Sequence, residues 1–257
     1  MLRMRQICLV ASDLQKAEED LSAVFGLAVC HRDAGVEVFG LRNFLMPVGN
    51  NFLEVVAPFR EGTAAGRYLE RRGGDGGYMV IMQTDDVLSA RERVLSMGIR
   101  LVLDDVARGR RESAGIQLHP RDVPGAIVEL RQDQDDASPD GPWRPAGPDW
   151  KAARTGLVRA MTAAEVQTDD PPALARRWGE VIERAVSVGP RGPEIALDDA
   201  VLRFVPARDG RGEGLAGLDF EVADRARIMQ AALARGCVAD GDTVVVCGVR
   251  FRLIERR

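Results

Sequence analysis

The chain has 257 residues, of which 46% are hydrophobic and 29% are charged, and its formal net charge is -4. This composition is typical of a globular protein and excludes a disordered or fibrous chain. Lys and Arg occur in short clusters along the whole sequence. The absence of a long basic stripe argues against nucleic acid as a partner.

The cysteines and the apolar runs indicate the compartment of the protein and whether it associates with a membrane. The four cysteines form no CxxC pair, so we interpret them as reduced thiols. The apolar run after Arg5 is ended by Ser12 and Asp13, too early for a signal peptide, and no window has the length of a membrane-spanning helix. We therefore expect a cytoplasmic protein that does not bind membranes.

The first predicted unit begins with the apolar run QICLVASDL at residues 6–14. Asp13 is a natural N-cap, so a helix is predicted over 14–24, and Gly26 follows its end. Extended stretches are predicted at 36–41 and 52–57, the second closed by Pro58. The order is therefore a strand, a helix and then further strands.

The same order returns 73 residues after Gln6, at Met79, in the sequence MVIMQTDDV. A helix over 87–96 and strands near 99–103, 115–118 and 126–130 are predicted to follow. Fainter copies span 159–204 and 215–254. A repeated supersecondary unit decides the architecture, so we predict an α+β protein of tandem βαβββ units.

The segment 132–154 concentrates Asp, Pro and Gly between two periodic regions, as an inter-domain linker does. We predict a first domain over 1–132, with units at 1–60 and 77–132, a linker over 133–154, and a second domain of two units over 155–257. Trp143 and Trp150 of the linker are expected to dock on a neighbouring surface.

Four sequence pieces resemble the vicinal oxygen chelate superfamily, which includes glyoxalase I, methylmalonyl-CoA epimerase, extradiol dioxygenases and bleomycin-resistance proteins. They are QICLVASDL followed by VFGL, NNFLEVVAP, MVIMQTDDV followed by MG, and LHPRDVPGAIVEL. The resemblance is clear in the first two units and faint in the last two. It implies that pairs of units form cup-shaped curved mixed sheets with helices outside, and that the second glyoxalase-like domain is degenerate.

In that superfamily the first and last strand of each unit point one residue each at a divalent metal, which holds substrate oxygens while a base moves protons. Carried onto this sequence, the first-strand positions are Gln6 and Met79, where the family usually has histidine, and the last-strand positions are Glu54 and Glu129. The resemblance thus implies metal ligands Gln6, Glu54 and Glu129, with Glu54 or Glu129 as catalytic base. A thioether is a poor ligand for hard cations, so Met79 leaves the site incomplete.

The cofactor implied is a divalent metal such as magnesium, manganese or iron, with no cofactor as the alternative. The spacings agree, because Glu54 follows Gln6 by 48 residues and Glu129 follows Met79 by 50. Salt-bridged acids on the two strands are the structural alternative, since alternation allows either face. Substrate contacts are expected from Met79 in the cup lining.

Further candidates lie outside the metal positions. The chain has two histidines, which excludes a multi-histidine metal centre within one chain. His119 is a candidate substrate-binding residue at the pocket rim, and Arg67, in the Gly-rich connection between the first two units, is another. In the second half Arg203 and Arg252 stand where the acids would be, which indicates either a structural pair or an anion site.

Two functions follow for a small-molecule protein, and whether it is an enzyme is left open. One is a metal-assisted lyase, isomerase or dioxygenase-like enzyme that uses Glu54 or Glu129. The alternative, motivated by the missing histidines, is a metal-free protein that binds or sequesters a small molecule, as the bleomycin-resistance branch does. A pure interaction module is a third reading, and a homodimer stays open.

Overall fold

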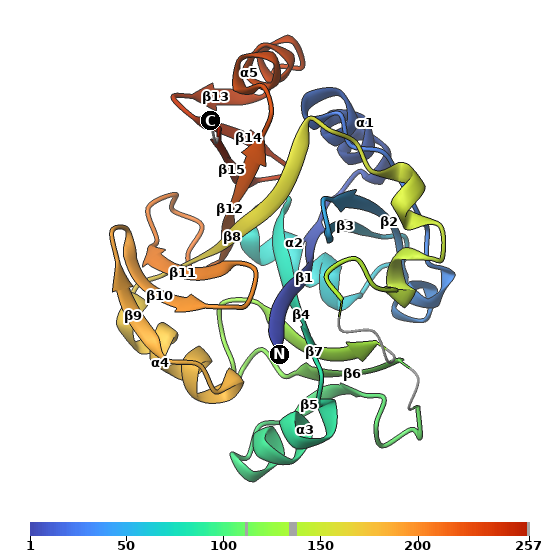
Figure 1. Cartoon of the computed structure of the whole chain (residues 1–257), viewed down its shortest axis with the longest axis vertical. Coiled ribbons are helices and arrows are strands. Elements are labelled where there is room, and N and C mark those ends of the chain that lie inside the picture. Colours follow the sequence, from blue (N-terminus) through green and yellow to red (C-terminus); the bar gives the residue numbers. More distant parts are fainter. Residues whose placement is uncertain (111–112, 134–137, 256–257) are drawn as a thin grey trace.

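The computed structural model describes residues 1–110, 113–133 and 138–255. Figure 1 shows two twisted β-sheets with helices arranged around their outside. Within the described residues no helix is both long and apolar enough to cross a membrane. The predicted α+β class with tandem units is confirmed.

The first sheet has seven strands in the order β2-β3-β1-β4-β7-β6-β5. At its centre β1 runs parallel to β3 and antiparallel to β4, and β4 runs parallel to β7. The elements of this half are β1 (Leu2–Val10), α1 (Leu14–Phe25), η1 (Ala34–Phe39), β2 (Leu41–Val48), β3 (Asn51–Pro58), α2 (Ala64–Arg72), β4 (Gly76–Thr84), α3 (Val87–Ser96), β5 (Leu101–Asp104), β6 (Ser113–Leu118) and β7 (Ile127–Asp133).

The second sheet has eight strands in the order β13-β14-β15-β12-β8-β11-β10-β9. Here β8 is parallel to β11 and antiparallel to β12, and β12 is parallel to β15, so the central pattern of the first sheet is repeated. Its elements are β8 (Val158–Thr168), α4 (Pro171–Ile182), β9 (Val186–Gly189), β10 (Gly192–Ala196), β11 (Val201–Pro206), β12 (Gly214–Val222), α5 (Arg225–Ala234), β13 (Val238–Asp240), β14 (Thr243–Val246) and β15 (Val249–Ile254).

The four helices that follow a first strand begin in the same way, with an aspartate side chain that accepts from the backbone N–H three residues later. Such a cap satisfies one of the free N–H groups of the first turn. The capping residues are Asp13, Asp86, Asp170 and Asp224. This local signal explains why the unit boundaries were readable from the sequence.

The strand predicted at 36–41 is wrong. Residues Ala34–Phe39 form the 3-10 helix η1, and the strand follows it at Leu41–Val48. The Asp33 side chain accepts from the N–H of Gly35 and starts the turn, and Gly40, in the left-handed region at φ 75°, ends it. The apolar alternation of this stretch was therefore overridden by turn residues at both ends.

The two sheets share one hydrophobic core, to which buried residues of both halves contribute. They approach closely where β4 meets β12, because an ideal Cβ on Gly77 would lie 2.5 Å from the carbonyl oxygen of Leu215. The halves also join where Trp178 of α4 donates from Nε1 to the carbonyl of Pro124 at 2.9 Å. The division into separate domains at 132 and 155 stays a prediction.

We expect Gly77→Ala to lower the free energy of unfolding by about 1–3 kcal/mol, because the added methyl group would collide with backbone as well as side chain of Leu215. Urea unfolding measures the change. Gly156→Ala is the matched control, since its Cβ would meet no atom within 4 Å. Equal stability of the two variants would contradict the close approach of β4 and β12.

Candidate functional site

The four positions singled out on the first sheet share one face. Cys8 lies opposite Glu54 on one side and opposite Met79 on the other, while Ile81 lies opposite Glu129. Directly paired residues point to the same side of a sheet, and so do residues two apart on one strand. Gln6, two residues before Cys8, therefore joins them on this face, which we call the first cup.

Glu54 of β3 is buried, and both of its oxygens accept hydrogen bonds. Gln6 Nε2 donates to Oε2 at 2.8 Å, and Asn43 Nδ2 donates to Oε1 at 2.6 Å. Burial raises the pKa of Glu54, and the charge of Glu129 raises it further, although the hydrogen bonds from Asn43, Cys8 and Gln6 act in the opposite direction. Both oxygens of the Glu54 carboxyl group therefore already have a hydrogen-bond donor.

Glu129 of β7 is also buried, and its partner is a cation. Arg131 Nε donates to Glu129 Oε1 at 2.6 Å, and Gln117 Nε2 donates to Oε2 at 2.7 Å. Arg131 also lies 3.6 Å from the buried carboxylate of Asp105. Glu129 is therefore a salt-bridged acid, which is the structural alternative to a metal ligand.

The first cup is filled by the segment that was predicted to be a linker. This segment carries η2 (Arg144–Ala146) and η3 (Trp150–Ala153). Trp143 and Trp150 are each only 1% exposed and belong to the same apolar cluster as Cys8 and Met79. Trp143 Nε1 donates to Gln6 Oε1 at 2.6 Å, so the indole ring lies where a ligand of the cup would meet Gln6.

Arg5 fastens this segment to the sheet. Its guanidinium donates to the carbonyl oxygens of Pro139 at 2.6 Å and Gly141 at 2.7 Å, and it lies within 5.6 Å of the ring centroids of Trp143 and Trp150. Burial lowers the pKa of Arg5 to about 9, so the group remains charged at neutral pH. These contacts form a cation–π and hydrogen-bonded clasp.

The residues of the first cup do not fit a hard divalent cation. The oxygen of Gln6 already accepts from an indole N–H, the thioether of Met79 is a soft ligand, and the carboxylate of Glu129 is paired with the guanidinium of Arg131. In the part of the chain that the structure describes, no group of three or more His, Cys, Asp and Glu side chains could hold a metal ion.

The two candidate rim residues make local contacts. His119 lies in the turn after β6, where its Nδ1 accepts from the backbone N–H of Arg121 at 3.2 Å. Arg67 on α2 donates to the carbonyl oxygen of Gly62 at 2.6 Å. The turn after His119 packs on the second half instead, because a Cβ on Gly125 would meet the side chains of Val166 and Leu174. The roles of His119 and Arg67 in substrate binding stay predictions.

The corresponding face of the second sheet, which we call the second cup, carries a different set of charges. The registers pair Arg203 with Glu165 and Arg252 with Asp219, as Glu54 pairs with Cys8 and Glu129 with Ile81. Arg203 and Arg252 thus stand at the positions of the two glutamates. Glu165 and Asp219 stand where the first cup has Cys8 and Ile81.

These charges form one network, which is buried at Arg203, Glu165 and Asp219 and partly exposed at Arg252. Arg203 Nη1 lies 3.2 Å from Asp219 and 3.6 Å from Glu165, and its Nε donates to Glu194 at 2.9 Å. Arg252 Nε donates to Asp219 at 3.0 Å. Arginines and acids therefore neutralise each other beneath the surface of the second cup.

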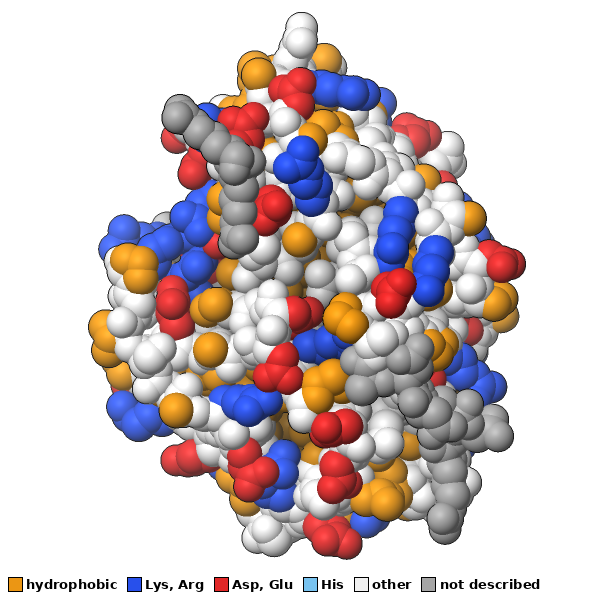
Figure 2. Space-filling view, viewed as in Figure 1, with side chains coloured by type: hydrophobic (Ala, Val, Ile, Leu, Met, Phe, Trp, Pro, Cys, Tyr) orange, Lys and Arg blue, Asp and Glu red, His pale blue; other side chains and the backbone are white. Residues whose placement is uncertain are grey.

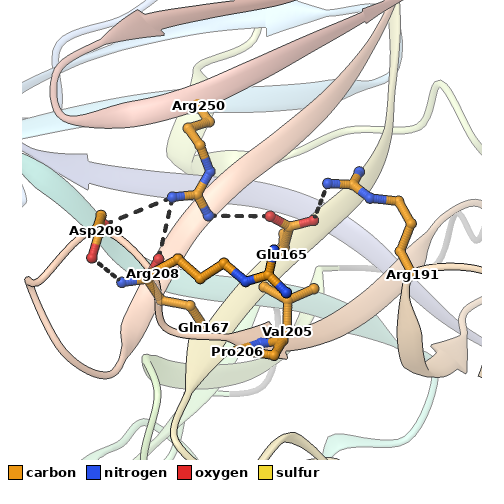
Figure 3. Close-up of a pocket in the computed structure, with 8 residues that line it drawn as sticks. All are labelled: Glu165, Gln167, Arg191, Val205, Pro206, Arg208, Asp209 and Arg250. Carbon is orange, nitrogen blue, oxygen red and sulfur yellow. Dashed lines mark hydrogen bonds and ion pairs between the residues drawn. The ribbon is translucent and has the colours of Figure 1, made fainter.

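Above this network lies an open pocket of about 540 Å³, a size suited to a small molecule. Figure 3 shows its lining, which consists of Glu165, Gln167, Arg191, Val205, Pro206, Arg208, Asp209 and Arg250. None of the residues that line this pocket is among the site residues predicted from the sequence. A usable signal was present in the strand sequence AEVQT, where Glu165 and Gln167 interrupt a buried apolar run.

Comparison with known proteins identifies a family that matches most of the chain and relatives that cover about half of it. The sequence model described as a glyoxalase-like domain matches residues 7–182. The ethylmalonyl-CoA/methylmalonyl-CoA epimerase of Cereibacter sphaeroides is 27% identical over 135 residues, which cover 51% of this chain and 97% of that protein. The human mitochondrial methylmalonyl-CoA epimerase is 23% identical over 130 residues, covering 51% of this chain and 73% of that protein.

Two solved structures match the chain along its whole length. A hypothetical protein from Staphylococcus aureus has a TM-score of 0.70 at 10% identity, with 100% of both chains covered. A mutant of 4-hydroxymandelate synthase from Streptomyces coelicolor has a TM-score of 0.68 at 16% identity, covering 98% of this chain and 92% of that one. At these identities the likeness concerns the fold, and it extends to both sheets.

Proposed function

The chain belongs to the glyoxalase-like domain family of the vicinal oxygen chelate superfamily, and from this premise we propose that it binds a small molecule without a metal, in the second cup. One observation carries the proposal. The first cup is occupied by Trp143 and its polar groups are satisfied by one another, whereas the second cup keeps a pocket of about 540 Å³. Binding rather than catalysis is the activity that this arrangement supports best.

Homologues in this superfamily typically use divalent metals, so the competing proposal is a metal-assisted lyase, isomerase or dioxygenase-like enzyme that uses Glu54 or Glu129. The contacts of Glu129 and Gln6 argue against the enzymatic proposal. A metal at Glu129 would have to displace the guanidinium of Arg131, and a substrate at Gln6 would have to displace Trp143. Both displacements would leave buried polar groups without partners.

The two proposals give opposite results with Mn²⁺. We expect titration calorimetry of the purified chain to show no saturable Mn²⁺ binding in the micromolar range. With or without Mn²⁺, we expect no exchange of the α-proton of methylmalonyl-CoA in deuterated buffer. By contrast, a metal-free thermal-shift screen of small organic acids, amino acids and phosphates should contain stabilising compounds, since a ligand at a hundred times its Kd adds about 2.7 kcal/mol.

Glu54→Gln is the control that separates a true metal site from adventitious binding. Saturable Mn²⁺ binding to the native chain that is lost in this variant would replace our proposal by the enzymatic one. A screen without any stabilising compound would also contradict small-molecule binding.

A further inference from the structure

The outermost strand of the second sheet, β9, has a free edge. It stands last in the strand order of that sheet, and within the described residues no strand pairs with its outer side. Residues 185–188 are all exposed, and Val188 is 91% exposed. Figure 1 places β9 at the left margin of the molecule, where Figure 2 shows hydrophobic side chains at the surface. An exposed apolar edge strand is a template for pairing with another chain.

The other three edges of the two sheets carry features that hinder such pairing. The edge of β2 is bridged by His31, which pairs with Leu45. The edge strands β5 and β13 end in Asp104 and Asp240, and charged residues discourage pairing at an edge. By contrast, β9 has the sequence VSVG, which contains neither a charged residue nor a proline. The edge of β9 is therefore suited to accept a further strand.

The backbone of β9 directs hydrogen-bonding groups outward at two residues. Val188 lies opposite Pro193 of β10, which has no N–H, so these two residues do not exchange a pair of hydrogen bonds. In an antiparallel ladder such pairs alternate with hydrogen-bonded ones, and their N–H and C=O groups point to the other side of the strand. The same holds for Val186, two residues earlier. Both valines thus offer backbone groups to a strand on the free side.

An open groove of about 430 Å³ lies beside this edge, between β9 and the end of α4. Val186 points toward α4, since its Cγ2 lies 3.0 Å from the position of a Cβ on Gly179. Val188, two residues further along the strand, points to the same face. The lining contains two arginines and two glutamates, whose charges balance, so the groove does not repel a second copy of the chain. Its residues are Arg176, Gly179, Glu180, Glu183, Arg184 and Val186.

A strand that matches both the free edge and the groove is β9 of a second copy. In an antiparallel pair of two β9 strands with the two-fold axis at Ser187, Val186 lies opposite the partner's Val188. Outward backbone groups then meet outward backbone groups, and they can exchange hydrogen bonds. Directly paired side chains point to the same face, so each Val188 lies at the groove beside the partner's Val186.

We propose that the chain forms a homodimer through the free edge of β9, which joins the second sheets of two copies into one continuous sheet. The groove shares no lining residue with the pocket of the second cup. The dimer is therefore independent of the proposed small-molecule function, and either can fail without the other.

Sedimentation equilibrium of the full chain tests the dimer. Because the interface is small, we expect reversible association with a Kd in the micromolar range, measured over roughly 1–500 µM protein. Val188→Lys should weaken the association by roughly tenfold or more, because it puts a charge beside the partner's Val186. Since the side chain is 91% exposed, this variant should fold as the native chain does.

Val238→Lys is the matched control, because Val238 is 68% exposed on β13, the opposite edge strand of the same sheet. It should associate as the native chain does. A native chain that stays monomeric over the whole concentration range would overturn the proposal. Equal association of the two lysine variants would do so as well.

A cysteine at the two-fold axis tests the register. Ser187 would lie opposite its own copy in a non-hydrogen-bonded pair, with Cα atoms about 4.5 Å apart, a distance that a disulfide spans. Oxidised Ser187→Cys should therefore run as a covalent dimer in non-reducing electrophoresis. The native chain, with its four cysteines, and Val102→Cys, on the edge strand β5, should stay monomeric. No more covalent dimer in Ser187→Cys than in Val102→Cys would overturn the pairing at Ser187.

Discussion

Replacing Trp143 by alanine is expected to lower the free energy of unfolding by about 3–5 kcal/mol, the usual cost of removing a large buried aromatic side chain. Trp143 is 1% exposed, and its indole N–H is the donor to Gln6 Oε1. The substitution therefore leaves both a cavity and an unsatisfied amide oxygen. Urea unfolding of the native chain and the variant measures the loss.

The same variant tests whether the indole ring occupies a ligand position of the first cup. Added indole should restore part of the lost stability by filling the cavity, while 1-methylindole, which lacks the N–H donor to Gln6, should restore less. A loss below about 1 kcal/mol would show that Trp143 does not fill the cup. Equal stabilisation by indole and 1-methylindole would show that the hydrogen bond to Gln6 does not contribute to stability.

Replacing Arg203 by methionine is expected to lower the free energy of unfolding by about 3–5 kcal/mol at neutral pH, because it removes a buried cation from a network of buried acids. Arg203 is 7% exposed and contacts Asp219, Glu165 and Glu194. Arg225→Met is the matched control, since Arg225 pairs with Glu255 at 3.6 Å with both side chains more than 40% exposed. Such a surface pair contributes at most about 1 kcal/mol. Chemical denaturation measures both losses. Equal losses of stability in Arg203→Met and Arg225→Met would contradict a buried charge network at Arg203.

The repeated order of elements could be predicted from the sequence because its signals are local. An aspartate cap, an amphipathic helix and an apolar strand each lie within a few residues, and they recur at Asp13, Asp86 and Asp224. The spacings of 48 and 50 residues from Gln6 and Met79 also placed Glu54 and Glu129 at equivalent strand positions. The same reasoning failed at residues 36–41, where Asp33 and Gly40 favour a tight turn over a strand.

The function of each cup could not be predicted in this way, because it depends on contacts between residues far apart in the chain. Trp143 meets Gln6 across 137 residues and thereby fills the first cup. The sequence identified Arg203 as a substituted position, but the acids that neutralise it lie on other strands, and only strand registers bring them together.

The sequence by itself therefore determined the repeating unit through local motifs, while the family and the positions expected to face each cup came from the resemblance of short sequence pieces to a known superfamily. The tertiary structure alone decided which cup is open. A segment that looks like a linker packs its two tryptophans into the first sheet, where burial of the aromatic rings and the hydrogen bond to Gln6 stabilise it. The second cup has buried arginine–carboxylate pairs at its base, and above them a pocket remains.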